Sequence, residues 1–362
     1  MSKLVRRARA HAGRVSELDV NVVELFGFGP MGATITAVRN GEGDLQLIKW
    51  NVVGNGALIE CVGRASGGVA SEIATIVVHS HLVVAVKNGE GKLEVSSWTQ
   101  DLLRQGSASK EGASQIAICP FSSESSPDFF ATAHRDAKGN LKVDVWSLSA
   151  TGAPKWRGGA FAGAVSEVTL AYLGFGTGLR YRFISAVRNA NGELELIQWA
   201  ASGDGATLQR LGSITAGSAT QISLRTLGDL VFTSLRNSAG NLEIISWRAH
   251  SNGLIDRLDT ARAGSACGVS STLSFDVSGA QFLTTAVRNT ADELELIDWL
   301  VYSSGTLQRS SSVVAGKGSL ACIRTAWNSQ NPGAVNPAPH SVLVTALCDE
   351  ASNLELNSWT RQ

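Results

Sequence analysis

Two recurring sets of polar side chains are the part of this sequence that could bind or transform a ligand. One set places a hydroxyl residue before a polar one: Ser16-Glu17, Ser71-Glu72, Ser114-Gln115, Ser166-Glu167, Thr220-Gln221 and Ser271-Thr272. The other is a series of cations: Arg39, Lys87, Arg135, Arg188, Arg236 and Arg288. Carboxylates can act as acids or bases, and guanidinium groups bind anions and hydroxyl-rich molecules. Near the C-terminus both series are interrupted, by Ser319-Leu320 and by Cys348.

The cations belong to a longer repeat, and one clear copy of it reads RNANGELELIQW at residues 188–199. Its seven copies end at Trp50, Trp98, Trp146, Trp199, Trp247, Trp299 and Trp359, which are 48, 48, 53, 48, 52 and 60 residues apart. A period of this size is typical of four-stranded propeller blades. Within each copy an Asn- or Asp-led turn separates two apolar stretches, which predicts a β-hairpin.

The repeat predicts the fold class. A third strand follows each Trp and a fourth opens each copy, and apolar residues lie on both faces, as in a sheet packed between two others. We therefore expect residues 1–362 to form a single all-β domain, a seven-bladed β-propeller of four-stranded antiparallel blades, with each Trp packed between blades. The N-terminal segment KLVRRA resembles the strand that the last copy lacks. Pairing of the N-terminal strand with the C-terminal blade would close the ring and remove the open sheet edge.

One turn position in the hairpins predicts a special backbone conformation. It holds Gly43, Gly91, Gly139, Gly192 and Gly240, but Asp292 and Ser352 in the last two copies. A recurring turn glycine indicates a positive φ, which other residues adopt at a cost. The turns at Asp292 and Ser352 should therefore be the most strained.

Composition argues against several classes of partner. Lys plus Arg and Asp plus Glu each number 31, so no net field attracts nucleic acid or a membrane surface. No apolar run has the length of a signal peptide or a membrane span, and the five cysteines are scattered without a CxxC pair. We expect a soluble, cytoplasmic protein with reduced thiols. Its oligomeric state is not determined by these features.

No cofactor and no metal ion are predicted. GFGPMG at residues 27–32 matches GxGxxG, but a strand pattern follows it instead of the helix that a phosphate site needs. HSH at residues 79–81 lacks a third ligand.

The opening strands of a propeller line its central channel, so the first polar set should form a ring near the channel mouth. The candidate ligand-binding residues are Glu17, Glu72, Glu167, Arg39 and Arg188. The breaks at Leu320 and Cys348 would give this funnel one apolar side. In the alternative interpretation each Glu pairs with an Arg and straps neighbouring blades together. The site would then lie on the long loops, at residues 327–340 or after Pro120.

The whole chain resembles a known repeat. The string T-A-V-R-N/D-x-x-G-x-L-x-L-I-x-W, with its lead-in A-G-x-x-S-E-I, is similar to the repeat of bacterial, notably cyanobacterial, seven-bladed propellers of mostly unassigned function. More loosely, it is similar to the propeller part of cyanobacterial enzymes that alkylate resorcinols. Those enzymes add a calcium-binding domain that no part of this sequence resembles, so the resemblance does not carry their activity over.

The preferred function is a non-catalytic binding or scaffolding propeller that recognises a small molecule, glycan or protein at a channel mouth. The alternative is an enzyme, for example of specialised metabolism, with its active site at the same mouth. Glu17, Glu72 or Glu167 would then be acid or base groups beside Arg39 or Arg188. Catalytic residues are otherwise unassigned, because the fold alone does not choose between these classes.

Overall fold

The chain consists of β-strands and turns. The computed structural model describes residues 3–23, 33–54, 56–78, 80–121, 129–176, 180–276, 278–328 and 340–361. These residues form 23 strands and no helix, which confirms the all-β prediction. Within the described ranges there is accordingly no helix capable of crossing a membrane.

Each copy of the repeat forms an antiparallel hairpin that ends at its Trp. The hairpins are β2 (Ala33–Asn40) with β3 (Asp44–Val53), β5 (His81–Asn88) with β6 (Lys92–Thr99), β8 (Phe129–Asp136) with β9 (Asn140–Leu148), β11 (Arg180–Asn189) with β12 (Glu193–Ala201), β14 (Leu230–Asn237) with β15 (Asn241–Ala249), β18 (Gln281–Arg288) with β19 (Glu293–Val301), and β22 (His340–Cys348) with β23 (Asn353–Arg361).

Long strands join one hairpin to the next. They are β1 (Leu4–Val23), β4 (Leu58–Val78), β7 (Arg104–Pro120), β10 (Pro154–Gly176) and β13 (Leu208–Leu227). In β4, residues up to Val69 pair with β3 and residues from Ala70 pair with β5, so a single strand serves two sheets. The sequence suggested separate third and fourth strands, but here they are continuous, because a β-bulge lets an extended chain bend from one sheet into the next.

Two other connections keep the expected break. They consist of β16 (Ile255–Ser265) followed by β17 (Cys267–Phe275), and β20 (Leu307–Lys317) followed by β21 (Ser319–Asn328). The strands build four-stranded antiparallel units, such as the one formed by the end of β10, β11, β12 and the start of β13.

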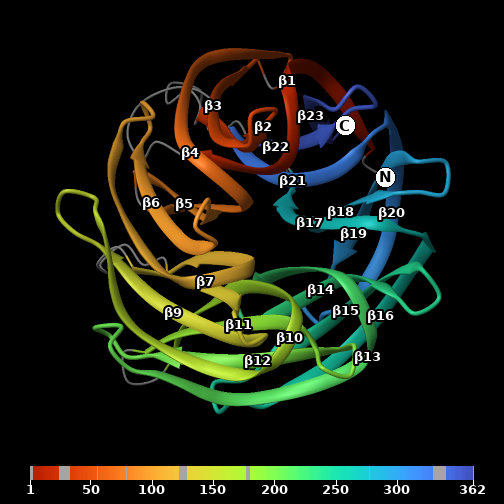
Figure 1. Ribbon diagram of the computed structural model, residues 1–362. Helices are drawn as coiled ribbons and strands as arrows, with labels where there is room; N and C mark the ends of the chain where they lie inside the picture. The colour runs from red at the N-terminus through yellow and green to blue at the C-terminus, as the bar shows by residue number, and fades with distance from the viewer. Residues whose placement is uncertain are drawn as a thin grey trace.

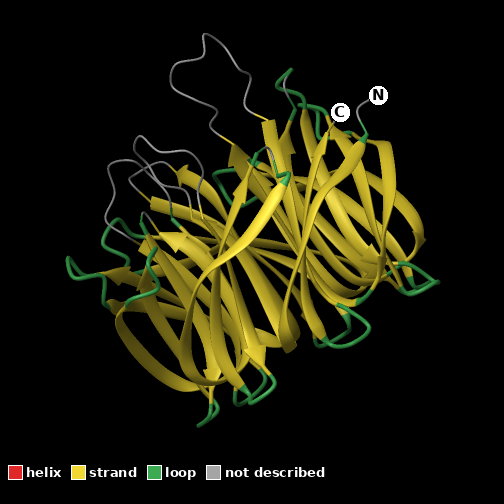
Figure 2. Ribbon diagram, turned by 90° about the horizontal axis from the view of Figure 1, so that it is seen from above, coloured by secondary structure: helices red, strands yellow, loops and turns green. Residues whose placement is uncertain are grey.

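The sheets follow one another around a common centre (Figure 1). We call the second halves of β1, β4, β7, β10 and β13, together with β17 and β21, the inner strands. Each inner strand contacts the next one around the centre, and β21 contacts β1. The two chain ends lie side by side, because the first half of β1 pairs with β23 through Leu4 opposite Arg361 and Val5 opposite Thr360. The turns lie at the ends of the sheets (Figure 2).

The core lies between neighbouring sheets. One cluster joins Val143 of β9 to Phe183 of β11 and Trp199 of β12, which belong to adjacent sheets. The seven repeat tryptophans are all buried, at 0–3% exposure. Because a Trp side chain buries more apolar area than most residues, these positions carry much of the packing. Their burial confirms the prediction that the repeat Trp packs in the core.

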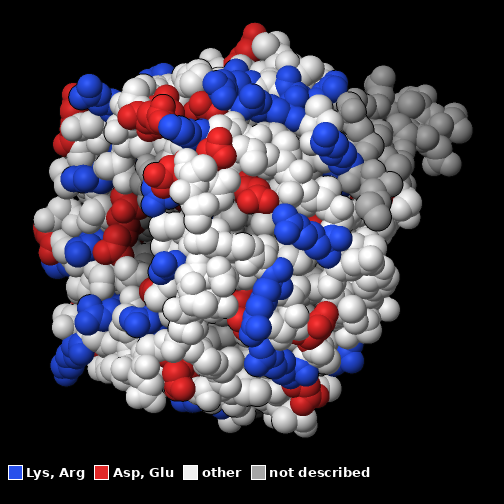
Figure 3. All heavy atoms as spheres, turned by 90° about the vertical axis from the view of Figure 1, so that its right-hand side faces the viewer, with Lys and Arg blue, Asp and Glu red and all other residues white. Residues whose placement is uncertain are grey.

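Charges of both signs are interspersed on the face shown in Figure 3, in keeping with 31 residues of each sign. This face therefore does not present an electrostatic field of a single sign.

Candidate functional site

The hairpin turns are shaped by their leading Asn or Asp. The Asn40 side-chain oxygen accepts hydrogen bonds from the backbone N–H groups of Glu42 and Asp44, at 3.0 and 2.9 Å. The same bonds recur at Asn189, whose side chain holds Asn191 and Glu193. Such local bonds make Asn and Asp favourable in turns. They place the preceding cation, Arg39 or Arg188, at the mouth of each turn.

The turn position predicted to have a positive φ does have one in every copy. Its φ is +91° at Gly43, +77° at Gly192, +59° at Asp292 and +63° at Ser352. This conformation lets the residue's carbonyl accept a hydrogen bond from the chain entering the next sheet, as in Ala70 N–H to Gly43 O at 3.1 Å. The glycine therefore links two sheets as well as reversing the chain.

Two of the cations bond to hydroxyl residues of the first polar set. Arg39 Nη1 donates to Ser16 Oγ and Arg188 Nη1 donates to Ser166 Oγ, both at 3.2 Å. Each guanidinium lies over its turn glycine, since a Cβ built on Gly192 would come within 3.0 Å of Arg188 Nη2. In these two places the hydroxyl set and the cation set therefore meet through Ser and Arg side chains, and not through Glu.

The glutamates instead point to the next sheet. A Glu72 carboxylate oxygen accepts the backbone N–H of Gln115, and Glu167 accepts that of Ile222 at 3.3 Å. Glu72 also lies 3.9 Å from Lys87 Nζ. Among the described residues no ion pair joins Glu17 to Arg39 or Glu167 to Arg188. The glutamates therefore link sheets through backbone N–H groups, whereas the alternative interpretation paired each Glu with an Arg.

The carboxyl group of Glu17 has a shifted pKa. Partial burial and the neighbouring Glu72 raise the pKa of Glu17, while Arg39 opposes this effect. The Glu17 carboxyl therefore stays protonated to a higher pH than an ordinary glutamate, which is the form that donates a proton.

The first polar set lies on β-bulges. Register shifts occur between Ser71 and Ile73 and between Thr220 and Ser223. Glu72 and Gln221 have φ of +59° and +55°, so non-glycine residues occupy the left-handed region there. Neither residue type indicates this backbone strain in advance.

The assignment of Ser271-Thr272 to this set is wrong. Cys267 pairs opposite Arg288, and Gly268 carries the positive φ of the bulge, +67°. Ser271 and Thr272 lie four residues further along β17 and are buried. Arg288 Nη2 lies 3.2 Å from Cys267 Sγ, where other copies have a hydroxyl. The spacing from the preceding Trp247 would have revealed the shift, since Cys267 lies 20 residues after it, as Ser319 does after Trp299. The Ser-Thr pair, however, resembled the motif more closely.

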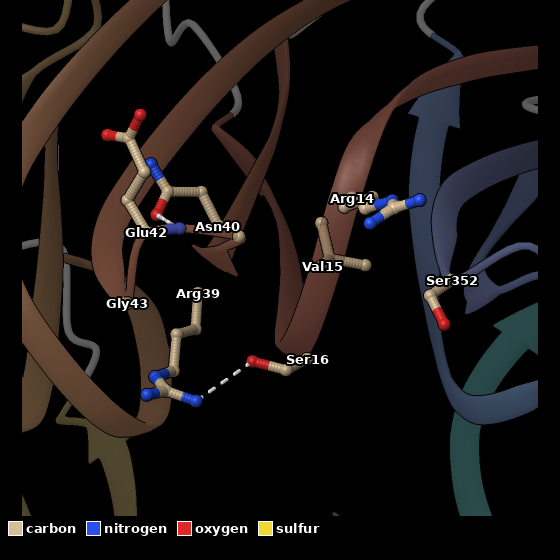
Figure 4. A pocket seen from close by; sticks show the side chains of 9 residues that line it. Arg14, Val15, Ser16, Arg39, Asn40, Glu42, Gly43 and Ser352 are labelled. Carbon is tan, nitrogen blue, oxygen red and sulfur yellow. Dashed lines mark hydrogen bonds between the residues drawn. The ribbon is translucent and has the colours of Figure 1, made fainter.

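Two equivalent pockets lie at the hairpin turns. The first, of about 350 Å³, is lined by residues that include Arg14, Ser16, Arg39, Glu42 and Ser352 (Figure 4). The second, of about 360 Å³, is lined among others by Arg135, Lys138, Ser166, Arg188 and Asn191. Each lies where the turn of one sheet meets the bulge and turn of the next, and each contains a Ser–Arg pair.

The structure therefore does not bring the predicted site residues together at one place. Arg39 and Arg188 line separate pockets, whereas Glu17 and Glu72 influence each other electrostatically. Arg14 and Lys138 were missed, because neither belongs to a motif that recurs in every copy. Cys348, placed on the apolar side of the funnel, is buried with its thiol 3.6 Å from Val15 O.

Several predicted features fall outside the described residues. They are the side chain of Leu320, all of GFGPMG, His79, and the long loops at residues 122–128 and 329–339.

The described residues include one group that could hold a metal ion, formed by His11, Asp349 and Glu355. The Arg9 guanidinium lies 3.2 Å from Glu355 and would compete with a cation there. The absence of a metal remains a prediction.

The third copy places a histidine where the other copies have Val or Leu, and an aspartate where four of the others have Ile. His134 and Asp144 are both fully buried, and neither His134 nitrogen has a hydrogen-bond partner among the described residues. Asp144 accepts a bond from Trp156 Nε1 at 2.8 Å and from Lys110 Nζ at 3.1 Å. Burial lowers the pKa of His134, although Asp144 partly offsets this effect.

Comparison with known proteins supports the fold. No protein-family model matches the chain, and no curated protein matches it in sequence. Among solved structures, a putative 6-phosphogluconolactonase from Bacteroides uniformis is similar with a TM-score of 0.57 and 13% identity, covering 78% of this chain and 82% of that one. Sqt1 of Saccharomyces cerevisiae gives 0.55 and 12%, covering 98% and 99%. The SapL1 lectin, in complex with alpha methyl fucoside, gives 0.51 and 13%, covering 84% and 97%.

These similar structures are β-propeller-like proteins, so the likeness shows a β-propeller-like fold for this chain. At such low identity it shows the fold alone.

Proposed function

We propose that this chain is a non-catalytic, seven-bladed β-propeller that binds a small molecule or glycan at the polar pockets of its hairpin turns. The observation that carries the proposal is the repetition of the pocket. In two separate places a Ser–Arg pair, an Asx-type turn and a cavity of about 350 to 360 Å³ come together. Arginine forks and amide groups are well suited to hydroxyl-rich or anionic ligands.

The blade number and the ring closure belong to the same proposal. Seven Trp hairpins support seven blades, and the pairing of β1 with β23 supports closure. So does the ion pair between Arg324 of β21 and Asp19 of β1, whose Nη2 and Oδ1 atoms are 3.1 Å apart. A cytoplasmic location with free thiols is likewise proposed.

Within the pockets we assign ligand contact to Arg39 and Arg188, and a sheet-linking role to Glu72 and Glu167. Glu17 lies beside the first pocket. Because the lectin similar in fold was solved with a fucoside, alpha methyl fucoside and other methyl glycosides are the first probes.

The test is isothermal titration calorimetry on the full chain after a glycan screen. Arg39→Gln and Arg188→Gln should each remove one class of sites, while Arg262→Gln, an exposed cation on β16, should bind as wild type. Unchanged binding in both pocket variants would refute the pocket assignment. Glu72→Gln should lower stability and leave affinity unchanged, and the reverse result would return the site to the glutamate ring.

An enzyme is the second candidate, favoured by the raised pKa of Glu17 beside Arg39. The putative 6-phosphogluconolactonase among the similar structures suggests a lactone as the first substrate to assay. Hydrolysis lost in Glu17→Gln would support this candidate. The looser resemblance to resorcinol-alkylating enzymes remains a hypothesis without a supporting residue.

A further inference from the structure

Two arginines occupy the same position on two inner strands. Arg225 of β13 and Arg324 of β21 each follow a bulge and fold back onto the preceding carbonyl. Arg225 Nη1 donates to Leu224 O at 2.6 Å, and Arg324 Nη1 donates to Ile323 O at 3.0 Å. In the other copies the equivalent residues are Asn21, Ile76, Cys119, Ala171 and Thr272, so the arginines are exceptions within the repeat.

Arg324 has a carboxylate partner on the next sheet. Its Nη2 lies 3.1 Å from Asp19 Oδ1 on β1, and Asp19 is buried. The other Asp19 oxygen accepts the backbone N–H and the hydroxyl of Thr75, at 2.8 and 2.9 Å. Both carboxylate oxygens of Asp19 therefore already have partners, and one of them pairs with Arg324.

Arg225 has no such partner within the described part of the chain. The residue that corresponds to Asp19 on the next sheet is Ser270 of β17. Ser270 Oγ accepts the backbone N–H of Ile323 at 3.3 Å, just as Asp19 accepts that of Thr75. The geometry of the Asp19 site is thus repeated around Ser270, but the negative charge is missing.

Without a carboxylate at Ser270, Arg225 has no ion-pair partner among the described residues. Burial, and next the neighbouring Arg324, lower the pKa of Arg225 to about 9, although Cys322 and the more distant charge of Asp19 partly offset this effect, so the group stays charged at neutral pH. A desolvated charge without a counter-charge is unfavourable, and a fixed arginine fork matches the planar oxygens of a carboxylate or phosphate.

We propose that an oxyanion, the carboxylate or phosphate group of a small molecule, binds Arg225 beside β17 and replaces there the carboxylate that Asp19 supplies to Arg324. This site is distinct from the pockets at the hairpin turns, and it does not depend on the proposed function.

The experiment measures binding of inorganic phosphate and of acetate to the full chain, at constant ionic strength set with chloride. We expect saturable binding of at least one anion, with a rise in melting temperature. Arg225→Gln should weaken it at least tenfold. Ser270→Asp should weaken it as strongly, because the new carboxylate occupies the site, and should raise the melting temperature without any added anion. Arg262→Gln is the control and should bind as wild type.

The anion that binds also identifies the ligand class, because phosphate points to a phosphorylated molecule and acetate to a carboxylic acid. The proposal is overturned if neither anion binds wild type, or if Ser270→Asp binds as tightly as wild type. Should Arg225→Gln fail to fold, Ser270→Asp alone decides. Arg39→Gln and Arg188→Gln should not affect this binding, which separates the outcome from that of the pocket test.

Discussion

The indole Nε1 of Trp199 donates a hydrogen bond to Ser185 Oγ at 2.9 Å, inside the core. The same bond over 14 residues joins Trp50 to Thr36, Trp146 to Thr132, Trp247 to Thr233, Trp299 to Thr285, and Trp359 to Thr345. Trp98 bonds to Ser96 instead, because Val84 occupies the usual partner position. The repeat therefore specifies a buried Trp ring together with a hydroxyl group that accepts a hydrogen bond from its indole N–H, because a buried N–H needs an acceptor.

Removing either side of this bond should destabilise the protein. We expect Ser185→Ala to cost about 1 to 3 kcal/mol, because it leaves the indole N–H unsatisfied, and Trp199→Ala to cost about 3 to 5 kcal/mol. Denaturant unfolding measures both. Ser107→Ala, on the exposed edge of β7, is the control and should change stability by less than about 0.5 kcal/mol. A similarly small effect of Ser185→Ala would contradict a stabilising role for the Trp199–Ser185 hydrogen bond.

The turn position should respond in opposite directions in different copies. Gly192 has φ +77° and Asp292 has φ +59°. Gly192→Ala should destabilise by about 1 to 2 kcal/mol, the cost of a left-handed residue, whereas Asp292→Gly should be neutral or stabilise by up to about 1 kcal/mol. Melting temperatures of the two variants test this, and equal shifts of the same sign would be inconsistent with it.

Acid sensitivity should depend on His134. Burial lowers the pKa of His134 in the folded state, so the unfolded chain binds the proton more readily. Stability from this residue is full above its unfolded pKa of about 6.5 and declines as pH falls below that value. His134→Val, which adopts the residue found at Val187, should therefore raise the melting temperature more at pH 5 than at pH 7.5. Parallel pH profiles for wild type and variant would exclude this role.

Deleting Met1 to Ala10 should lower the melting temperature far more than removal of a frayed tail. Leu4 is 1% exposed, and Arg6 Nη1 donates to Ala315 O at 2.9 Å on β20. A chain beginning at Lys3 serves as the control and should melt as the full chain does. An unchanged melting temperature in the longer deletion would remove the support for ring closure.

Much of the fold was predictable because its signals are local and repeated. The Asn-led turn, the turn glycine and the buried Trp recur with the hairpin that they shape, so Asp292 and Ser352 could be expected to have a positive φ. The candidate site was less predictable, because its atoms meet only across sheets. Glu72 reaches the N–H of Gln115 some 43 residues away, and no spacing in the sequence indicates that bond.

The sequence by itself determined the strand pattern, the hairpins and the positions of the core tryptophans, since each depends on residues close together in the chain. Only the tertiary structure decided which polar groups pair. It placed Cys267 and not Ser271 at the bulge opposite Arg288, and it gave Asp19 to Arg324 while leaving Arg225 without a carboxylate in the described residues. The physical reason is that these side chains come from segments far apart in the chain, such as Asp19 and Arg324, and meet only where neighbouring sheets pack together.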